Sequence, residues 1–275
     1  MTLTRELVFR NTASQKGRHI SVTPRASAMD RLHYGRIVLD AEVPRVSFET
    51  GPREVGLICL AGSCTIEVKG ENYSLAQYDA LYLPRGIFAT VVTKSQVDLV
   101  DFEAEVDGDY PVQLVRYADV QADPALKFQA GGDASTRSLN VLLGANVKAG
   151  RILGGFTRSL PGHWTSWPPH EHEAMLEELY VFYDMPAPAF GIQCVYAPNG
   201  EPNRAEIVRD GDAVCIPRGY HPNVSVPGHG INFVWLMAAH REQVDRKMGV
   251  VNVEPGFAGK GSGLEAATRS AVAGR

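Results

Sequence analysis

The sequence has no strongly basic region and no long apolar run. Its 27 Lys and Arg residues nearly balance 31 Asp and Glu residues, for a formal net charge of −4. Without a basic stripe, nucleic acid is not an expected partner. No apolar run approaches the roughly 20 residues that span a bilayer, so no membrane-spanning helix is expected. The first twenty residues also lack the apolar core of about 7–15 residues that marks a signal peptide, and we therefore expect a cytoplasmic protein.

Cysteine is scarce as well. The four cysteines, Cys59, Cys64, Cys194 and Cys215, lie in segments that resemble strands and do not have the spacing of a metal site. This pattern favours small buried hydrophobic residues in a reducing compartment rather than disulfides or thiolate ligands.

Helical periodicity is weak throughout. Short helices are expected only at 239–249 and at 263–275, and the second of these segments is equally compatible with a frayed tail. Most of the chain consists of short β-branched and aromatic runs separated by Gly, Pro, Asn and Asp, as in "EVGLICLAGSCTIEVKGENYSL". With 44% hydrophobic residues to form a core, the sequence predicts an all-β sandwich or barrel.

An internal repeat indicates two similar β domains. "YDALYLPRGIF" (78–88) aligns without gaps to "GDAVCIPRGYH" (211–221), and seven of the eleven positions are identical or apolar in both. Pro-Arg-Gly alone is a common turn tripeptide, but the flanking strand residues share the same frame. We therefore predict an N-terminal domain at 1–120 and a C-terminal domain at 121–275.

The two copies differ where a metal ligand could lie. His221 in the second copy corresponds to Phe88 in the first, and six of the eight histidines lie at or after position 163. We therefore expect the N-terminal domain to contain no metal. Phe88 is predicted to be a buried aromatic residue there.

"SWPPHEHEAMLEELYVFYD" (166–184) contains the strongest candidate ligands. His170 and His172 are two residues apart, so on a strand their rings would point to the same side. The alternative is a pair of exposed histidines in a polar loop. Together with Glu177 and His221 they would form a set of three imidazoles and one carboxylate, which suits Zn(II), Mn(II), Fe(II) or Ni(II).

These residues resemble the two motifs of the cupin family, G-x5-H-x-H-x3,4-E-x6-G and G-x5-P-x-G-x2-H-x3-N. His170, His172 and Glu177 match the first motif, and the second begins at Gly211 and leads to His221. The resemblance implies a bicupin, two jelly-roll β-barrels with few short helices. It also implies Glu177 rather than its neighbour Glu178 as the ligand, with Zn or Mn as the expected metal and Fe or Ni as alternatives.

"PPHEH", "PRGYHP" and "STRSLNVLL" resemble the 5-deoxyglucuronate isomerase family of inositol catabolism. That family belongs to a bicupin group that includes the 4-deoxy-5-keto-uronate isomerases of pectin breakdown. The resemblance implies a metal-dependent aldose–ketose isomerase that acts on a small deoxy-uronic acid, either 5-deoxyglucuronate or the 4-deoxy-5-keto compound. A non-catalytic sugar-binding bicupin and a metal-dependent dioxygenase are further alternatives, and a homo-oligomer is compatible with all of these.

Four residues are predicted to contact the substrate. Arg137 lies in the family-like segment and would bind the substrate carboxylate; Arg218 is the alternative cation, although a structural surface role suits it better. Trp167, Tyr180 and Gln193 are expected to line the pocket, with a plain core role as the alternative for Trp167 and Tyr180. The catalytic base is not identified by the sequence.

Overall fold

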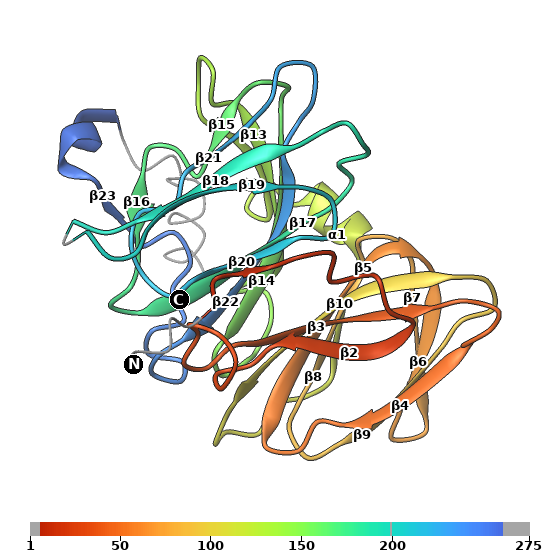
Figure 1. Ribbon diagram of the computed structural model, residues 1–275. Coiled ribbons are helices and arrows are strands. Elements are labelled where there is room, and N and C mark those ends of the chain that lie inside the picture. The colour runs from red at the N-terminus through yellow and green to blue at the C-terminus, as the bar shows by residue number, and fades with distance from the viewer. Residues whose placement is uncertain (1–5, 199, 261–275) are drawn as a thin grey trace.

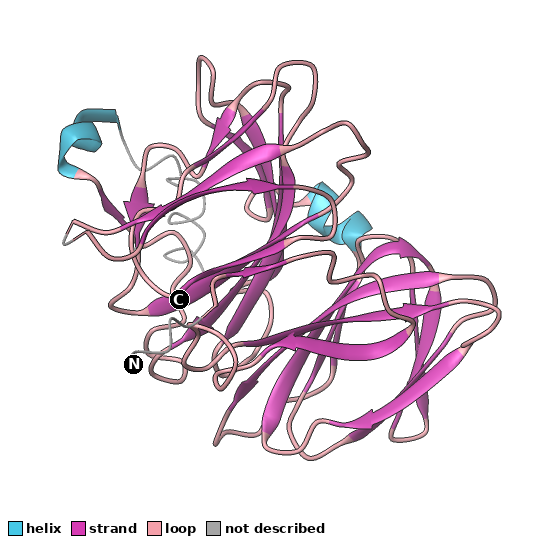
Figure 2. Ribbon diagram, in the orientation of Figure 1, coloured by secondary structure: helices cyan, strands magenta, loops and turns pink. Residues whose placement is uncertain are grey.

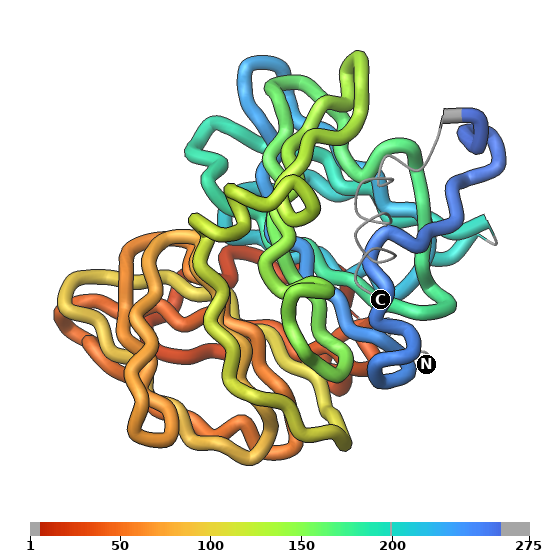
Figure 3. The backbone as a smooth tube through the Cα atoms, turned by 180° about the vertical axis from the view of Figure 1, so that it is seen from behind, coloured from red at the N-terminus to blue at the C-terminus, as the bar shows by residue number. Residues whose placement is uncertain are grey.

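The protein consists of two β-sheet lobes that lie side by side (Figures 1 and 3). The computed structural model describes residues 6–198 and 200–260. Nearly all of the regular structure in these residues is strand, with one α-helix, α1 (Tyr117–Ala122), and one 3-10 helix, η1 (Pro255–Lys260) (Figure 2). The all-β prediction is confirmed.

The first lobe is a sandwich of two antiparallel sheets. The six-stranded sheet has the order β11 (Gln113–Val115), β8 (Ala80–Leu83), β5 (Arg53–Gly62), β10 (Val97–Glu105), β3 (His33–Leu39), β2 (Gly17–Val22). The four-stranded sheet has the order β4 (Arg45–Glu49), β9 (Phe88–Val92), β6 (Cys64–Val68), β7 (Glu71–Leu75). Alternate side chains of these strands fill the space between the sheets with aliphatic residues such as Leu57, Ile66 and Leu99.

The second lobe repeats this plan. Its seven-stranded sheet has the order β1 (Val8–Phe9), β20 (Ala213–Ile216), β17 (Leu176–Phe182), β22 (Asn232–Ala239), β14 (Ile152–Ser159), β13 (Arg137–Leu143), β12 (Lys127–Ala130). The four-stranded sheet has the order β15 (Trp164–Thr165), β21 (Asn223–Ser225), β18 (Gly191–Tyr196), β19 (Asn203–Val208). A short ladder joins β16 (His170–Glu171) to β23 (Asn252–Val253).

Strand β1 does not follow the predicted division at residue 120. It pairs with β20 of the second lobe, with Val8 opposite Val214 and Phe9 opposite Ala213. The red N-terminal segment in Figure 1 can be followed from the first lobe to this position. The N-terminal residues thus complete the sheet of the other lobe, and local sequence patterns cannot show such an exchange.

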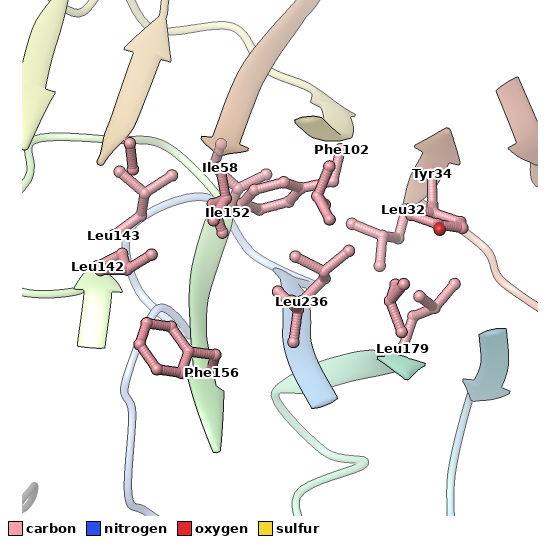
Figure 4. Close-up of a cluster of buried hydrophobic side chains, with 14 of the residues drawn as sticks. Leu32, Tyr34, Ile58, Phe102, Leu142, Leu143, Ile152, Phe156, Leu179 and Leu236 are labelled. Carbon is pink, nitrogen blue, oxygen red and sulfur yellow. The ribbon is translucent and has the colours of Figure 1, made fainter. Parts of the chain in front are cut away.

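The two large sheets pack face to face and form a shared core. Phe102 and Ile58 from the first lobe belong to the same buried cluster as Phe156, Leu179 and Leu236 from the second (Figure 4). A Cβ on Gly56 or Gly154 would come within 2.3 or 2.7 Å of the Phe102 ring, so glycine at both positions lets the sheets approach closely. Both faces of each large sheet are therefore buried.

Strand β17 has two such buried faces. Leu176 and Tyr180 belong to the core inside the second lobe, whereas Leu179 and Val181 belong to the core between the lobes. Every residue of the strand is buried, including Glu177 and Glu178, so its sequence does not alternate between polar and apolar residues.

The structure also bears on three local expectations, which concern Phe88, two short helices and membrane-spanning helices. Phe88 is 57% exposed, so the prediction of a buried aromatic residue is wrong; its neighbour Ile87 is the buried one. Ala239 ends β22 and residues 240–249 form turns and bends instead of a helix, and the expected helix at 263–275 lies outside the described residues. Among the described helices, none has the length and apolar character needed to cross a membrane.

Candidate metal and substrate site

Three histidines and one glutamate meet inside the second lobe. His170 begins β16 and His172 follows it, Glu178 lies in β17, and His221 lies between β20 and β21. None of the four is more than 5% exposed. The fold therefore brings together the three imidazoles that sequence analysis predicted to converge, although they come from two distant segments of the chain.

The side chains form a close cluster around one carboxylate oxygen. Glu178 Oε2 lies 3.0 Å from His172 Nε2 and 3.1 Å from His221 Nε2. One ligand atom from each of these three residues falls within 4.8 Å of the others. The ring of His170 completes the group, with its centroid 5.0 Å from that of His221.

Each histidine uses Nδ1 to contact a backbone carbonyl. The pairs are His170 with Pro168, His172 with Leu176 and His221 with Gly219, at 2.9, 3.1 and 2.9 Å. A carbonyl oxygen can only accept, so Nδ1 carries the proton in each ring. In a neutral imidazole Nε2 then carries the lone pair, and that atom faces the cluster at His172 and His221.

The protonation states follow from burial and from the carboxylate. Burial, together with the nearby His221, lowers the pKa of His170 to about 3, so this ring is neutral. Burial also opposes charge on Glu178, but its contacts with His172 and His221 prevail and lower its pKa to about 2. Burial also acts to lower the pKa of His172. Its hydrogen bond to Glu178 and the charge of that carboxylate outweigh burial and raise the pKa.

This donor set fits a divalent cation. Within the described residues, His221 Nε2 is buried without a hydrogen-bond partner although an anionic oxygen lies 3.1 Å away. A lone pair directed at a carboxylate is repulsive unless a proton or a cation lies between the two atoms. Zn(II), Mn(II) and Fe(II) accept imidazole nitrogens and carboxylate oxygens as ligands. The hydrogen bonds from Nδ1 to backbone carbonyls would hold the imidazole rings in place for such an ion.

The carboxylate of the cluster is Glu178, which corrects the choice of Glu177. Glu177 faces the other lobe, where its oxygens accept hydrogen bonds from the backbone N–H groups of residues 30–32 at 2.5–2.8 Å. Neighbouring residues on a strand point to opposite faces, so only one of the two glutamates can face the histidines. Tyr180 lies on the inward face, and Glu178, two residues before it, shares that face.

The cluster opens onto a cavity inside the second lobe. Most of the surface of its wall is apolar, and polar side chains of the cluster, of Arg137 and of several hydroxyl residues reach it. The lining residues are, in chain order, Arg137, Leu139, Thr157, Ser166, His170, His172, Leu176, Glu178, Tyr180, Phe233, Trp235, Met237 and residues 248–251. An apolar cavity with a small number of converging polar groups is typical of a small-molecule site.

Two of the predicted substrate residues line this cavity. Arg137 is buried, and its guanidinium donates to the carbonyls of Ser135 at 3.1 Å and Trp167 at 2.8 Å, which fix its position. The hydroxyl of Tyr180 lies 2.7 Å from Ser166 Oγ. Burial, and then the charge of Glu178, raise the pKa of Tyr180 well above its usual value of about 10, so the phenol remains protonated.

The other two do not line the cavity. The ring of Trp167 packs between Trp164 and Phe257, with centroid distances of 5.3 and 5.0 Å. Gln193 is fully buried behind the cluster, where its amide donates to the carbonyl of His221 at 2.9 Å. Gln193 therefore supports a histidine of the cluster rather than contacting the cavity.

Several cavity residues were missed by sequence analysis. Thr157 lies on β14, and Trp235 and Met237 lie on β22. Nearly all residues of these strands are buried, so no alternation of polar and apolar residues shows which side faces the cavity. Residues 248–251 lie beyond the last long strand. They reach the cavity because β23 pairs with β16, with Val253 opposite His170, and this pairing holds the chain across the site.

Fold and site together define a two-lobed cupin protein with a buried imidazole–carboxylate cluster in its second lobe. The model of the KduI/IolB family matches residues 7–252, which is most of the chain. The chain belongs to the KduI/IolB family.

Two relatives illustrate the range within this family. A 5-deoxy-glucuronate isomerase from Geobacillus kaustophilus is 25% identical over 254 residues, which cover 86% of this chain and 90% of the relative. A 4-deoxy-L-threo-5-hexosulose-uronate ketol-isomerase from Kineococcus radiotolerans is 30% identical over 246 residues, which cover 79% of this chain and 84% of the relative. The similarity thus extends to enzymes with two different names.

Solved structures share the fold. An IolB-like protein from Salmonella typhimurium superposes with a TM-score of 0.82 at 22% identity and covers 92% of this chain and 98% of its own. Oxalate decarboxylase from Bacillus subtilis, described with Mn(II) centres, superposes with a TM-score of 0.62 at 12% identity and covers 92% of this chain and 80% of its own. At these identities the structural similarity establishes the bicupin fold alone.

Proposed function

We propose that this protein is an isomerase that interconverts the aldose and ketose forms of a deoxy-uronic acid. The substrate we favour is 5-deoxyglucuronate, which would give 5-dehydro-2-deoxygluconate in inositol catabolism. The observation that carries the proposal is the cluster of His170, His172, Glu178 and His221, of which the first three line a cavity that also contains Arg137. Family membership and the names of the relatives support the reaction type.

The cluster is proposed to hold a divalent cation, with Zn or Mn first and Fe or Ni as alternatives. When bound, such an ion supplies Lewis-acid stabilisation of the negative charge that develops on substrate oxygens during isomerisation. The three Nδ1–carbonyl contacts orient the rings, and ionised Glu178 offsets part of the cation's charge.

Arg137 is proposed to bind the carboxylate of the sugar acid. Its guanidinium lies in the cavity wall and is held by two backbone carbonyls, so little side-chain entropy would be lost on binding. A charge-assisted contact in a mostly apolar cavity would fix one end of the substrate and place its carbonyl end toward the cluster.

The isomerisation itself moves one proton between neighbouring carbons. A base removes it from the hydroxyl-bearing carbon beside the carbonyl, and an acid returns it to the former carbonyl carbon. The hydroxyl proton passes to the former carbonyl oxygen, so the carbonyl and the hydroxyl exchange places with no net oxidation of the molecule. Tyr180 is unsuited to be the resting base because its phenol stays protonated. It can instead donate a hydrogen bond, since its hydroxyl lies at the cavity together with that of Ser166.

A direct assay tests the proposal. Purified protein with measured metal content is mixed with 5-deoxyglucuronate, or separately with the 4-deoxy-5-keto-uronate, and the conversion is followed by NMR in D2O. We expect conversion of the first compound, with solvent deuterium in the product unless the proton is shielded from exchange. The matched control is the double variant His170→Ala/His172→Ala, which should lose both metal and activity.

The alternatives give different results in the same assay. Conversion of only the 4-deoxy-5-keto compound would reassign the protein to the pectin-breakdown branch. Oxygen uptake without isomerisation would support a dioxygenase, and sugar binding without turnover would support a binding protein. A cytoplasmic location and a possible homo-oligomeric assembly remain predictions. The lack of a nucleic-acid partner is also a prediction, and the net charge of −4 and the absence of a basic stripe support it.

A further inference from the structure

Trp235 lines the same cavity and has an unused hydrogen-bond donor. It lies on β22 opposite Tyr180 of β17 and is 3% exposed. Within the described part of the chain, its indole Nε1 is buried and has no hydrogen-bond partner. Phe233, which lies two residues earlier on the same face, lines the cavity without any polar atom.

The backbone of the neighbouring strand is shaped to accept the indole ring. Gly155 of β14 lies opposite Trp235, and a Cβ at that position would be 2.3 Å from Cζ2 and 2.9 Å from Cε2 of the ring. Real Cβ atoms do not approach so closely, so only glycine leaves this space. Cε2 is bonded to Nε1, and Gly155 therefore helps to fix the position of the N–H group.

A buried N–H group without an acceptor is costly. Leaving such a donor unsatisfied destabilises the folded protein, and a phenylalanine would pack apolar surface without this penalty. Other donors that line the cavity already have partners, since the hydroxyl of Tyr180 lies 2.7 Å from Ser166 Oγ and the guanidinium of Arg137 donates to two backbone carbonyls. An acceptor that enters with the substrate would satisfy the indole and would be recognised by it.

We propose that Trp235 is a substrate-binding residue whose indole N–H donates a hydrogen bond to an oxygen of the bound sugar acid. The inference rests on the proposed function, because it concerns the ligand of the same cavity. Trp235 and Arg137 would then contact different oxygens of one substrate, and an acid that lacks the matching oxygen would be discriminated against.

The first test observes the indole directly in the unmodified protein. The chain has three tryptophans, so a protein labelled with ¹⁵N gives three indole N–H signals. Trp164→Phe and Trp167→Phe each remove one signal and so assign the third without changing the cavity lining. Adding 5-deoxyglucuronate or the 4-deoxy-5-keto-uronate should shift the Trp235 signal and leave that of Trp164 in place. Binding with no shift at Trp235 would overturn the inference.

The second test is kinetic. Trp235→Phe keeps an aromatic ring but removes the donor, so we expect KM to rise and kcat/KM to fall roughly five- to tenfold, with metal content and melting temperature little changed. Trp164→Phe, outside the cavity lining, should keep the original values. Unchanged kinetics in Trp235→Phe would refute the role of the N–H group and leave the isomerase proposal intact. Failure of the unmodified, metal-containing protein to convert either compound would instead refute the proposed function, and this inference with it.

Discussion

Glu54 and Glu177 occupy matching positions in the two lobes, and each binds the backbone of the other lobe. Glu54, in β5, accepts hydrogen bonds from the N–H groups of residues 150–152 at 2.6–2.8 Å. Glu177, in β17, accepts them from residues 30–32 at 2.5–2.8 Å. Both side chains are at most 1% exposed. The two glutamates therefore form a reciprocal pair of contacts across the interface, and this explains why Glu177 is unavailable to the histidine cluster.

Separate replacement of Glu177 and Glu178 by glutamine distinguishes a structural role from a metal-binding role. Glu178→Gln should lose most of the bound metal because an ionised ligand becomes a neutral amide. Glu177→Gln should retain the metal but reduce the free energy of unfolding by about 1.5–3 kcal/mol, since charge-assisted hydrogen bonds are lost and an amide N–H would face backbone donors. Metal analysis and urea unfolding of both variants measure the two effects. Metal loss in Glu177→Gln with an intact cluster in Glu178→Gln would reverse our assignment.

Glu54→Gln should resemble Glu177→Gln. Glu54 also accepts a hydrogen bond from the hydroxyl of Tyr82 at 2.6 Å, so its carboxylate has four donors. We expect a loss of about 1.5–3 kcal/mol in the free energy of unfolding, with metal content unchanged. Tyr82→Phe removes only one of these donors and is the milder control. Equal stability of Glu54→Gln and the unmodified protein would argue against an energetic role for the reciprocal pair.

Arg137→Ala should impair substrate binding without removing the metal. The loss of a charge-assisted hydrogen bond to a carboxylate corresponds to a decrease in kcat/KM of about 10- to 150-fold. Arg218→Ala is the matched control, because Arg218 is exposed and does not line the cavity. A decrease in kcat/KM that is confined to Arg218→Ala would show that Arg218, and not Arg137, binds the substrate carboxylate.

Gln193→Ala should act through His221. The amide of Gln193 donates to the carbonyls of His221 and Cys194 at 2.9 and 2.8 Å, and its oxygen accepts from Asn223 at 2.9 Å. Loss of these hydrogen bonds should weaken metal binding about 10- to 100-fold, which is typical when a residue that positions a metal ligand is removed. A competition titration with a chelator measures the affinity. If Gln193→Ala raised KM and left the metal affinity unchanged, the result would instead support the predicted contact between Gln193 and the substrate.

Phe88→Ala should change the free energy of unfolding by no more than about 0.5 kcal/mol, because the side chain is 57% exposed. Phe102→Ala, in the core between the lobes, should cost about 3–5 kcal/mol. Thermal or urea unfolding compares the pair. A large loss in Phe88→Ala alone would show that its ring is covered in the native protein.

The sequence by itself determined the all-β class and the three histidines of the cluster. Short runs with frequent turn residues exclude a helical fold, and the i, i+2 spacing of His170 and His172 brings both into the same lobe. The repeat at 78–88 and 211–221 indicated two related lobes. These features depend on local geometry and on short motifs, which a single sequence contains.

Only the tertiary structure decided between Glu177 and Glu178. A strand covered on one face alternates between polar and apolar residues, and this alternation reveals its inward side. Strand β17 is covered on one face by the barrel and on the other by the first lobe, so both faces are buried and the pattern disappears. The same packing of lobe against lobe gives Glu177 its backbone partners and directs Glu178 to the histidines.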